Sequence, residues 1–341
     1  MTFAREFAIA GRAVGPGHPC LVIAEAGVNH FGDMDKALAL VDLAVDAGAD
    51  VLKIQHFRTD VLVGPSAPDW RERLRSKELS DTQVLRIRDH CDRRGILFMC
   101  TGHDEDSLDF LDREAGVPAF KVGSGEVGNW PSLTAMARRG KPIILSTGMY
   151  EMADISAALE AIAAGGGREV AVLHCVTSYP TDPADVNLAV MGQIRDLFPG
   201  PVGYSDHTTG TAVPLAAVAL GADVIEKHIT IDRDVPNAQD WKVSCDPSNL
   251  AAFVAGIREV EAARGGAPKA LATAERQSLL WARKSLTAAR DIAAGECLTA
   301  DMLVAQRPGD GLPPSRIGEV VGRTAHRSFA RGTKIDPAGL T

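Results

Sequence analysis

The feature that most constrains the fold is a repeated unit, a short apolar run followed by a segment with helical spacing. Runs that are apolar almost throughout, rather than in alternation, are typical of strands buried on both faces. Eight occur in the first 232 residues: LVIAEAGV (21–28), VLKIQHF (51–57), ILFMCTG (96–102), AFKVGSG (119–125), PIILSTG (142–148), VAVLHCVT (170–177), PVGYSDHT (201–208) and VIEKHITI (224–231).

Helical patterns separate these runs, at 35–47, 80–94, 152–164, 211–220 and 247–263. The first stops at Gly48, the second begins with a candidate N-cap, Ser80, and the fourth ends at Gly221. Strand–helix units repeated eight times predict a (β/α)₈ TIM barrel. A doubly wound open sheet is the main alternative, but GSGE at 123–126 lacks the GxGxxG spacing of a dinucleotide-binding turn.

The units stop before the end of the chain. The stretch RGGAPKALATAE (264–275) contains Gly and Pro, which indicate a linker. From about Ala282 the chain has few long apolar runs and several turn signals, including RPGDG and LPP, which predict a compact, irregular, β-rich module. We therefore predict a barrel at 1–265, a linker at 266–281 and a small C-terminal domain at 282–341.

Charge and cysteine content exclude several classes of protein. Lys and Arg number 36 against 44 Asp and Glu, a net charge of −8, whereas a general nucleic-acid binder shows a basic face. The six cysteines are scattered without a CxxC pair, which argues against a zinc knuckle or a disulfide scaffold. The longest bland run, 212–222, is too short to cross a bilayer. We expect a soluble, cytoplasmic protein with neither nucleic acid nor membrane as partner.

Polar residues collect at the C-terminal ends of the predicted strands, where barrel enzymes keep their chemistry. Charged side chains within apolar strands are costly unless they are paired or functional, which makes Lys53, Lys121 and Lys227 informative. The strand ends carry Glu25, Asn29, Lys53, Gln55, His56, Thr101, His103, Lys121, Ser124, Glu126, Ser146, Thr147, His174, Thr177, Ser178, Tyr179, Ser205, Asp206, His207, Glu226, Lys227 and His228.

Two of these groups predict binding sites. His207 and His228 end neighbouring strands, and converging imidazoles suit a divalent metal such as Mn²⁺ or Zn²⁺. The alternative is that each histidine only hydrogen-bonds within its loop, and we favour the metal. Lys53 and Lys121 can hold a small phosphorylated or carboxylated anion. A structural ion pair between Lys53 and Glu25 is the alternative. Hydroxyls that could join the anion site belong to Thr101, Ser124, Ser146 and Ser205.

The motifs resemble those of the N-acetylneuraminate (sialic acid) synthase family, which includes legionaminic and pseudaminic acid synthases. The barrel motifs are IAEAGVNHFG (23–32), KIQHF (53–57), KVGSGE (121–126), ILSTGM (144–149), HCVTSYPT (174–181), YSDHT (204–208) and GADVIEKHIT (221–230). The stretch SLTAARDIAAGECLTADMLVAQRPGDG (285–311) resembles the family's antifreeze-like (SAF) domain. The resemblance covers nearly the whole chain.

This resemblance implies condensation of phosphoenolpyruvate with an N-acyl hexosamine, N-acetylmannosamine or a related 2,4-diacetamido sugar. The products are a nonulosonic acid and phosphate. His207 and His228 would hold Mn²⁺ or Mg²⁺, which would polarise the sugar aldehyde. Members are domain-swapped homodimers in which the antifreeze-like domain covers the partner's barrel.

The resemblance also implies roles for individual residues. Glu25 is the candidate for proton handling, and Asp240 matches an acid that orients metal-bound water. Gln55 and Glu126 would face the sugar hydroxyls, and Arg307 would reach the N-acyl group. The phosphoenolpyruvate contacts would be Lys53, Thr101, Lys121, Ser124, Ser146, Tyr179 and Ser205.

Three stretches depart from the family pattern near this pocket. PNAQDWKVS (236–244) stands where many members have Gly-Pro-Asp, Thr177 where some have asparagine, and CTGHD (100–104) where Thr-Pro is more usual. They concern the identity of the sugar more than the reaction. Three alternative functions stay open. They are a metal-dependent pyruvate aldolase, a Schiff-base aldolase that uses Lys121 or Lys227, and a non-catalytic protein that binds ice or glycans.

Overall fold

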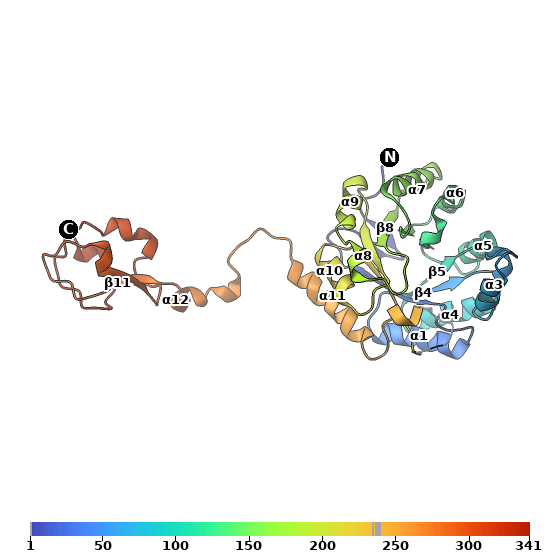
Figure 1. Cartoon of the computed structure of the whole chain (residues 1–341), viewed down its shortest axis with the longest axis horizontal. Helices are drawn as coiled ribbons and strands as arrows, with labels where there is room; N and C mark the ends of the chain where they lie inside the picture. Colours follow the sequence, from blue (N-terminus) through green and yellow to red (C-terminus); the bar gives the residue numbers. More distant parts are fainter. Residues whose placement is uncertain (1, 234, 236–239) are drawn as a thin grey trace. The chain divides into compact units, whose positions relative to one another are not determined.

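The computed structural model describes residues 2–233, 235 and 240–341. The chain divides into two compact units, Met1–Gly265 and Gly266–Thr341. Figure 1 draws both, with helices and strands labelled.

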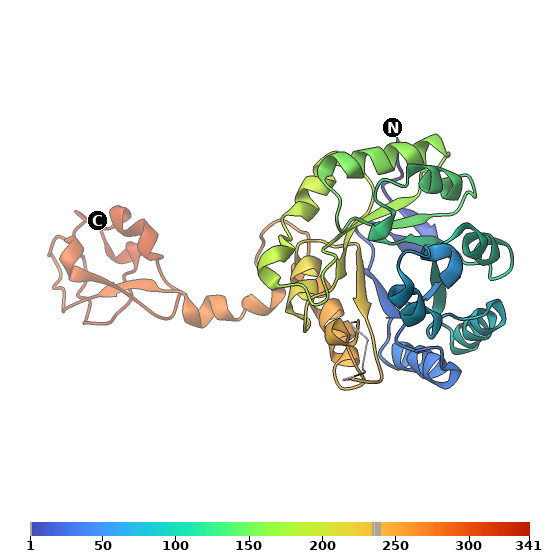
Figure 2. The same cartoon turned by 45° about the vertical axis from the view of Figure 1, so that its right-hand side comes forward.

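The first unit is built around eight parallel strands. Hydrogen bonds join them in the order β5-β4-β3-β10-β9-β8-β7-β6, and helices surround them (Figure 2). β5 and β6, the two ends of this order, lie side by side, and no ladder joins them within the described ranges, so the barrel is nearly closed. The strands are β3 Leu21–Gly27, β4 Val51–His56, β5 Leu97–Gly102, β6 Phe120–Val122, β7 Ile143–Ser146, β8 Val170–Cys175, β9 Val202–Asp206 and β10 Val224–His228. The predicted (β/α)₈ barrel is confirmed, and each strand falls inside one predicted run.

Helices cover the outside of the barrel, and five of them match the predicted helical patterns, whereas the helices at Glu105–Arg113, Trp130–Ala137 and Val190–Leu197 were not predicted. Ser80 caps α4 by accepting a hydrogen bond from the Gln83 amide in a capping box, and Gly95, at φ +74°, ends that helix. The outer helices are α1 Met34–Asp46, α4 Asp81–Arg94, α5 Glu105–Arg113, α6 Trp130–Ala137, α7 Met152–Ala164, α9 Val190–Leu197, α10 Ala212–Ala219 and α11 Leu250–Arg264. Three short helices lie in the connections after β4 and β8: α2 Thr59–Leu62, α3 Pro68–Arg75 and α8 Pro183–Val186.

An antiparallel hairpin before the barrel, β1 Phe7–Ile9 and β2 Arg12–Val14, was not predicted. Its apolar side chains join an inner core that includes Leu21, Val51 and Val224, the first residues of their strands. The hairpin therefore packs against the N-terminal end of the barrel interior. The polar strand ends lie at the opposite end, where the loops that follow the strands meet.

The second unit is small and irregular, as predicted. After α12 Ser278–Ala282, strands β11 Ser285–Ala288 and β12 Leu303–Gln306 form an antiparallel pair. Isolated bridges tie this pair and the neighbouring loops to the C-terminal segment, for example Thr287 to Lys334. The unit has its own apolar core of Leu286, Ala288, Ile292, Leu298, Met302, Leu303, Leu312, Val320, Ala325, Phe329, Ile335 and Leu340.

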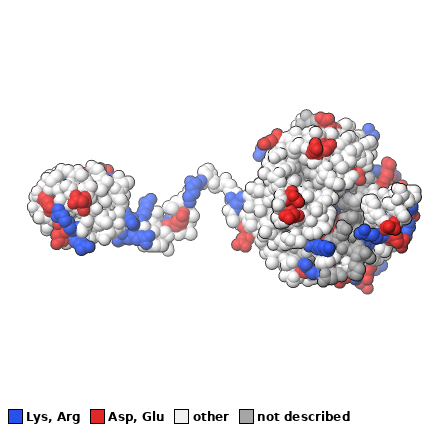
Figure 3. Space-filling view, viewed as in Figure 1, with Lys and Arg blue, Asp and Glu red and all other residues white. Residues whose placement is uncertain are grey.

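Surface and cysteine properties complete the description. All six cysteines are free thiols, and only Cys297 among them is exposed. No helix in the described ranges is long and apolar enough to span a bilayer. On the face of the first unit drawn in Figure 3, positive and negative side chains are interspersed over a largely uncharged surface.

Candidate active site

A buried network of two lysines and two carboxylates lies inside the C-terminal end of the barrel. Lys53 Nζ is 2.8 Å from Glu25 Oε2 and 3.6 Å from Glu226 Oε2, and it donates a hydrogen bond to Thr101 Oγ1 at 3.2 Å. Lys121 Nζ is 3.5 Å from Glu226 Oε1. All four ionisable side chains are at least 93% buried. Glu226 thus bridges the two lysines, and the Lys53–Glu25 ion pair that we held as an alternative is present.

Hydroxyls from neighbouring strands complete this network. Ser146 Oγ accepts a hydrogen bond from Lys121 Nζ at 2.7 Å, and Ser205 Oγ donates to Glu226 Oε1 at 2.9 Å. One oxygen each of Glu25 and Glu226 has no hydrogen-bond partner among the described residues, although lysine lies within ion-pair distance of both.

The two carboxylates have opposite proton affinities. Burial raises the pKa of Glu25 above its usual range, with the charge of Glu226 adding to the effect against the pull of Lys53. Burial also acts to raise the pKa of Glu226, but Lys121 and Lys53 together hold it at about 2. Glu226 is therefore the permanent counter-charge of the lysines, and Glu25 is the carboxylate suited to exchange a proton.

His207 and His228 lie together beside this network. Their ring centroids are 5.3 Å apart, and the ring of Tyr179 lies 4.0 Å from that of His207 and 5.8 Å from that of His228. The Nδ1 of His207 is 2.8 Å from the carbonyl oxygen of Val176. An Nδ1–H that donates to this carbonyl leaves the lone pair of Nε2 available.

The same two histidines fit a divalent metal. Burial lowers the pKa of His228 to about 3, so its imidazole is neutral, and its buried Nδ1 has no hydrogen-bond partner among the described residues. Neutral imidazoles are good ligands for Mn²⁺ and related ions. Burial acts to lower the pKa of His207 too, but its contacts with the Cys175 thiol and the Val176 carbonyl raise that pKa, so a metal at His207 would displace a proton. No group of three or more His, Cys, Asp or Glu side chains suited to a metal occurs in the described ranges. The remaining ligands would therefore come from water and substrate.

Three further predicted residues converge over Gly27. A Cβ at this glycine, which has φ +55°, would lie 3.4 Å from Glu25 Oε1, 3.5 Å from Asp240 Oδ2 and 3.6 Å from Gln55 Nε2. The Gln55 amide also donates to Glu25 Oε1 at 3.0 Å. Asp240 therefore lies near Glu25, at the C-terminal end of the barrel. Residues 236–239 of the departing stretch lie outside the described residues.

A second glycine brings the loops after β6, β7 and β8 together. A Cβ at Gly148 would lie 2.2 Å from Thr177 Oγ1 and 2.9 Å from Ser124 Oγ. The Gly148 amide donates to Ser124 Oγ at 2.9 Å. Only glycine fits here without displacing the two hydroxyls. Ser124, Ser146 and Thr177 thus line one side of the pocket with small oxygen and amide groups.

A cavity of about 410 Å³ lies between α5, α6 and the segments that join these helices to β5 and β6. Its lining includes Thr101 and His103 on one side and Glu126 and Asn129 on the other. Glu126 accepts a hydrogen bond from Asn129 Nδ2 at 2.6 Å. The cavity lies where β5 and β6 are not joined by a ladder, and through Thr101 it borders the lysine network.

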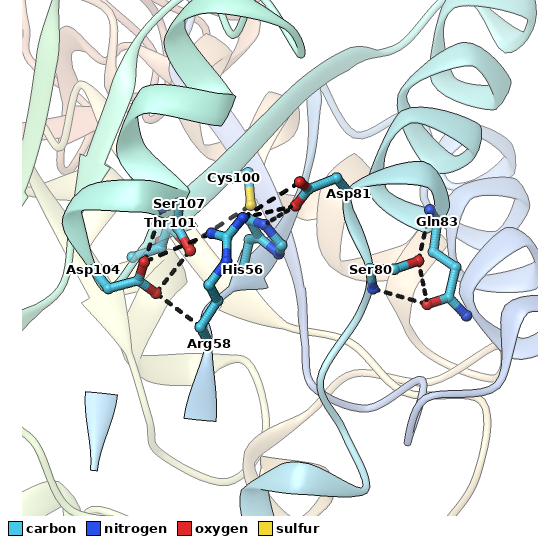
Figure 4. Close-up of polar contacts among 9 residues, drawn as sticks. All are labelled: His56, Arg58, Ser80, Asp81, Gln83, Cys100, Thr101, Asp104 and Ser107. Atoms are coloured by element: carbon cyan, nitrogen blue, oxygen red, sulfur yellow. Dashed lines mark hydrogen bonds and ion pairs between the residues drawn. The ribbon is translucent and has the colours of Figure 1, made fainter. Parts of the chain in front are cut away.

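A group of hydrogen bonds and ion pairs connects the C-terminal ends of β4 and β5 (Figure 4). Asp104 Oδ2 accepts hydrogen bonds from the Arg58 amide at 2.8 Å and from Ser107 Oγ at 2.7 Å. Asp81 Oδ1 is 3.0 Å from His56 Nε2, and Arg58 Nη2 is 3.3 Å from Asp81 Oδ2. Because these contacts join the loops after the two strands, they fix the ends that carry Gln55 and Thr101.

Arg307 lies in the second unit. Its Nε donates to the carbonyl oxygen of Ala282 at 3.1 Å, and its guanidinium lies 5.9 Å from the ring centre of Trp281, which is 60% exposed. The structure therefore places one predicted site residue on the surface of the second unit and brings the others to the C-terminal end of the barrel.

Sequence reasoning missed two residues of interest. Glu226 was noticed as a strand-end charge but given no role, because its position between Lys53 and Lys121 depends on the closure of the barrel. Trp281 was not singled out. Its only signal is that an aromatic residue stands close to the start of the C-terminal domain.

Comparison with known proteins identifies both parts of the chain. A family model described as the NeuB family matches residues 40–269, and a SAF domain model matches residues 283–341. The N,N'-diacetyllegionaminic acid synthase of Legionella pneumophila is 37% identical over 333 residues, which are 93% of each chain. The human N-acetylneuraminate-9-phosphate synthase is 39% identical over 328 residues, which are 92% of this chain and 90% of the human one.

A solved structure agrees with these matches. The N-acetylneuraminic acid synthetase of Leptospira borgpetersenii, crystallised with citrate, superposes with a TM-score of 0.76 at 31% identity. The alignment covers 82% of this chain and 96% of that one.

Proposed function

The chain belongs to the NeuB family, whose named members are synthases of sialic-type acids, and from this premise we propose that it condenses phosphoenolpyruvate with an N-acyl hexosamine. The products are a nonulosonic acid and inorganic phosphate. The observation that carries the proposal is the buried Lys53–Glu25–Glu226–Lys121 network beside two converging histidines. It offers positive charge for a small anion and a proton-exchanging carboxylate within one pocket.

Phosphoenolpyruvate binds at the lysines. Its phosphate and carboxylate bind to Lys53 and Lys121, which are natural point charges for such groups, as Glu25 gives up its contact with Lys53 while Glu226 stays between the two lysines. The hydroxyls of Thr101, Ser124, Ser146 and Ser205, with the Gly148 amide, supply neutral donors, and Tyr179 closes the pocket over the histidines. This arrangement holds the ligand with C3 free to react.

His207 and His228 would hold Mn²⁺ or Mg²⁺. When bound, this ion supplies a Lewis acid that polarises the aldehyde of the sugar. C3 of phosphoenolpyruvate then forms a bond to the aldehyde carbon as the C=O π electrons move onto the aldehyde oxygen, which becomes a hydroxyl by taking the proton that Glu25 removes from the water adding at C2. Water adds at C2, and the tetrahedral carbon expels phosphate by C–O cleavage.

Glu25 carries the proton in this sequence. A carboxylate with a raised pKa can take the proton of the water that adds at C2. Asp240 and Gln55 lie against the same glycine, so they orient Glu25 and the water near it. Glu226 stays ionised and keeps Lys53 and Lys121 charged.

The sugar occupies the open side of the pocket. Gln55 and Glu126 face its hydroxyls, and the cavity beside Glu126 has room for a substituent. Arg307 reaches the N-acyl group from the second unit of a partner chain, in a domain-swapped homodimer whose domains are 1–265 and 282–341, joined by 266–281. The six free thiols favour a reducing compartment, and we propose a cytoplasmic location.

Phosphate release tests this function. A panel of 2-acetamido and 2,4-diacetamido hexoses is incubated with phosphoenolpyruvate and Mn²⁺, and released phosphate is compared with the 2-keto acid formed. We expect equal amounts of the two products with at least one sugar. Product formed from pyruvate, without phosphoenolpyruvate, would instead identify an aldolase. A borohydride-trapped adduct on Lys121 would identify its Schiff-base variant.

A further inference from the structure

Strands β9 and β10, which lead to His207 and His228, carry a second buried charge pair on their opposite face. Lys227 Nζ is 2.5 Å from Asp206 Oδ2, and both side chains are at least 98% buried. Successive residues of a strand point to opposite faces. Ser205 and Glu226 meet inside the barrel, so Asp206 and Lys227 point outward toward the helices.

This outer pair is fully hydrogen-bonded. Asp206 Oδ1 accepts from Tyr204 Oη at 3.0 Å, from the Thr208 amide at 3.1 Å and from Thr208 Oγ1 at 2.9 Å. Lys227 Nζ also donates to the carbonyl oxygen of Thr208 at 2.7 Å. The contacts tie β9, β10 and the loop that follows β9 into one unit.

The position of the pair along the strands is the important point. Lys227 and Asp206 are the last residues paired in the β9–β10 ladder, and His228 and His207 follow them directly. Beyond this point no ladder bond fixes the separation of the two strands. The outer pair therefore acts where the backbone must hold two imidazoles at a set distance.

We propose that Asp206 and Lys227 are positioning residues for the His207–His228 metal site, an inference that rests on the proposed function. A buried ion pair is often no more stabilising than apolar residues of similar volume. Its directional contacts, however, fix geometry, and supporting residues of this kind commonly control metal affinity. Lys227, with its amine bound on the outer face, is unavailable as a Schiff-base nucleophile in the pocket.

The test measures Mn²⁺ binding to metal-free full-length protein by electron paramagnetic resonance. The double variant Asp206→Asn/Lys227→Met removes both charges and keeps an acceptor for Tyr204 and Thr208. We expect its Kd for Mn²⁺ to rise roughly 10- to 100-fold. Tyr204→Phe, which removes one contact to Asp206, should raise the Kd a few-fold and serves if the double variant does not fold.

The matched control is Asp223→Ala, at the other end of the same two strands. Asp223 Oδ2 accepts from the Val202 amide at 2.9 Å, so its loss weakens the start of β9 and lowers Tm. We expect its Mn²⁺ affinity to equal that of the unaltered protein. If affinity instead follows Tm across all variants, or if the double variant and Tyr204→Phe bind Mn²⁺ normally, the positioning role is wrong.

His207→Ala separates this inference from the proposed function. If the unaltered protein binds Mn²⁺ and His207→Ala does not, the metal site stands and the outer-pair variants test positioning alone. If His207→Ala binds Mn²⁺ as tightly as the unaltered protein, the metal site itself is misplaced, and the positioning role is overturned with it.

Discussion

The inner and outer faces of the same strands carry buried charges of two kinds. The inner group joins Lys53, Lys121, Glu25 and Glu226, and one oxygen of each carboxylate has no hydrogen-bond partner among the residues that the structure describes. The outer pair has a hydrogen-bond partner for each of its oxygens. Both arrangements bury charge away from the surface, where an unpaired group is costly. In the proposed function, the inner lysines bind the substrate anion when Glu25 gives up its contact with Lys53. The outer pair keeps its protein partners and binds no ligand.

Removing an imidazole should have the largest effect on the inner face. We expect His228→Ala to lower kcat by at least about 10³-fold, because Lewis-acid stabilisation of the developing charge is worth several kcal/mol. Phosphate release measures the rate, and circular dichroism checks that the fold persists. Full activity of metal-stripped protein in chelator would contradict the role of both histidines.

Replacing only one residue of the outer Asp206–Lys227 pair should destabilise the protein. Lys227→Met leaves Asp206 buried without its counter-charge, and we expect the free energy of unfolding to fall by about 3–5 kcal/mol. Urea denaturation measures this. A loss below about 1 kcal/mol would show that Asp206 finds another partner and that the two faces do not differ in the way described.

Removing an inner lysine should weaken substrate binding and leave the stability of the protein nearly unchanged. We expect Lys53→Met to raise KM for phosphoenolpyruvate about 10- to 100-fold, the equivalent of one lost charged hydrogen bond. Stability should change little, because Glu25 already has a raised pKa and can become protonated when the lysine is absent. Steady-state kinetics measures the change in KM, and urea denaturation measures the change in the free energy of unfolding. A stability loss as large as that of Lys227→Met would erase the distinction between the faces.

The pH profile tests which inner carboxylate exchanges the proton. Glu25 must be ionised to act as a base, so kcat/KM should fall as pH drops through its raised pKa. The Gln55 amide stabilises the ionised form, so Gln55→Ala should move this acidic limb to higher pH. Glu226, with a pKa of about 2, should add no limb in the working range. An unmoved limb in Gln55→Ala would exclude Glu25 as the titrating group.

The sequence was a good guide wherever one physical rule decides. Continuous apolar runs predict the eight strands, and Ser80 is confirmed as the N-cap of α4. Strand-end polarity locates the pocket. Hairpin β1–β2 escaped notice because three-residue strands carry little periodicity.

Pairings within the pocket were harder to foresee. Alternation along β10 predicts that Glu226 and Lys227 face opposite sides, but not which residue faces inward. That choice depends on the register of β9 against β10, which pairs Glu226 with Ser205 and Lys227 with Asp206. The roles of Asp206 and Glu226 therefore became visible only in three dimensions.

Arg307 offers a third case, a surface charge that belongs to neither face of the barrel. We expect Arg307→Ala to raise KM for the sugar about tenfold, the loss of one charged hydrogen bond, and to leave KM for phosphoenolpyruvate unchanged. Arg327→Ala is the matched control, because Arg327 also lies over an aromatic ring of the second unit and is exposed. Equal loss for both substrates would remove Arg307 from the sugar site.

Mixing two inactive or weakened chains then tests whether Arg307 acts on a partner. Arg307→Ala has an intact barrel, and His228→Ala has an intact second unit. If the second unit serves the partner's barrel, a mixed dimer contains one site with both parts intact, so mixing should restore the normal KM for the sugar in a fraction of sites. If Arg307 serves its own barrel, every site in the mixture keeps one defect and nothing is restored. Complementation therefore decides whether Arg307 acts on the barrel of its own chain or on that of a second copy.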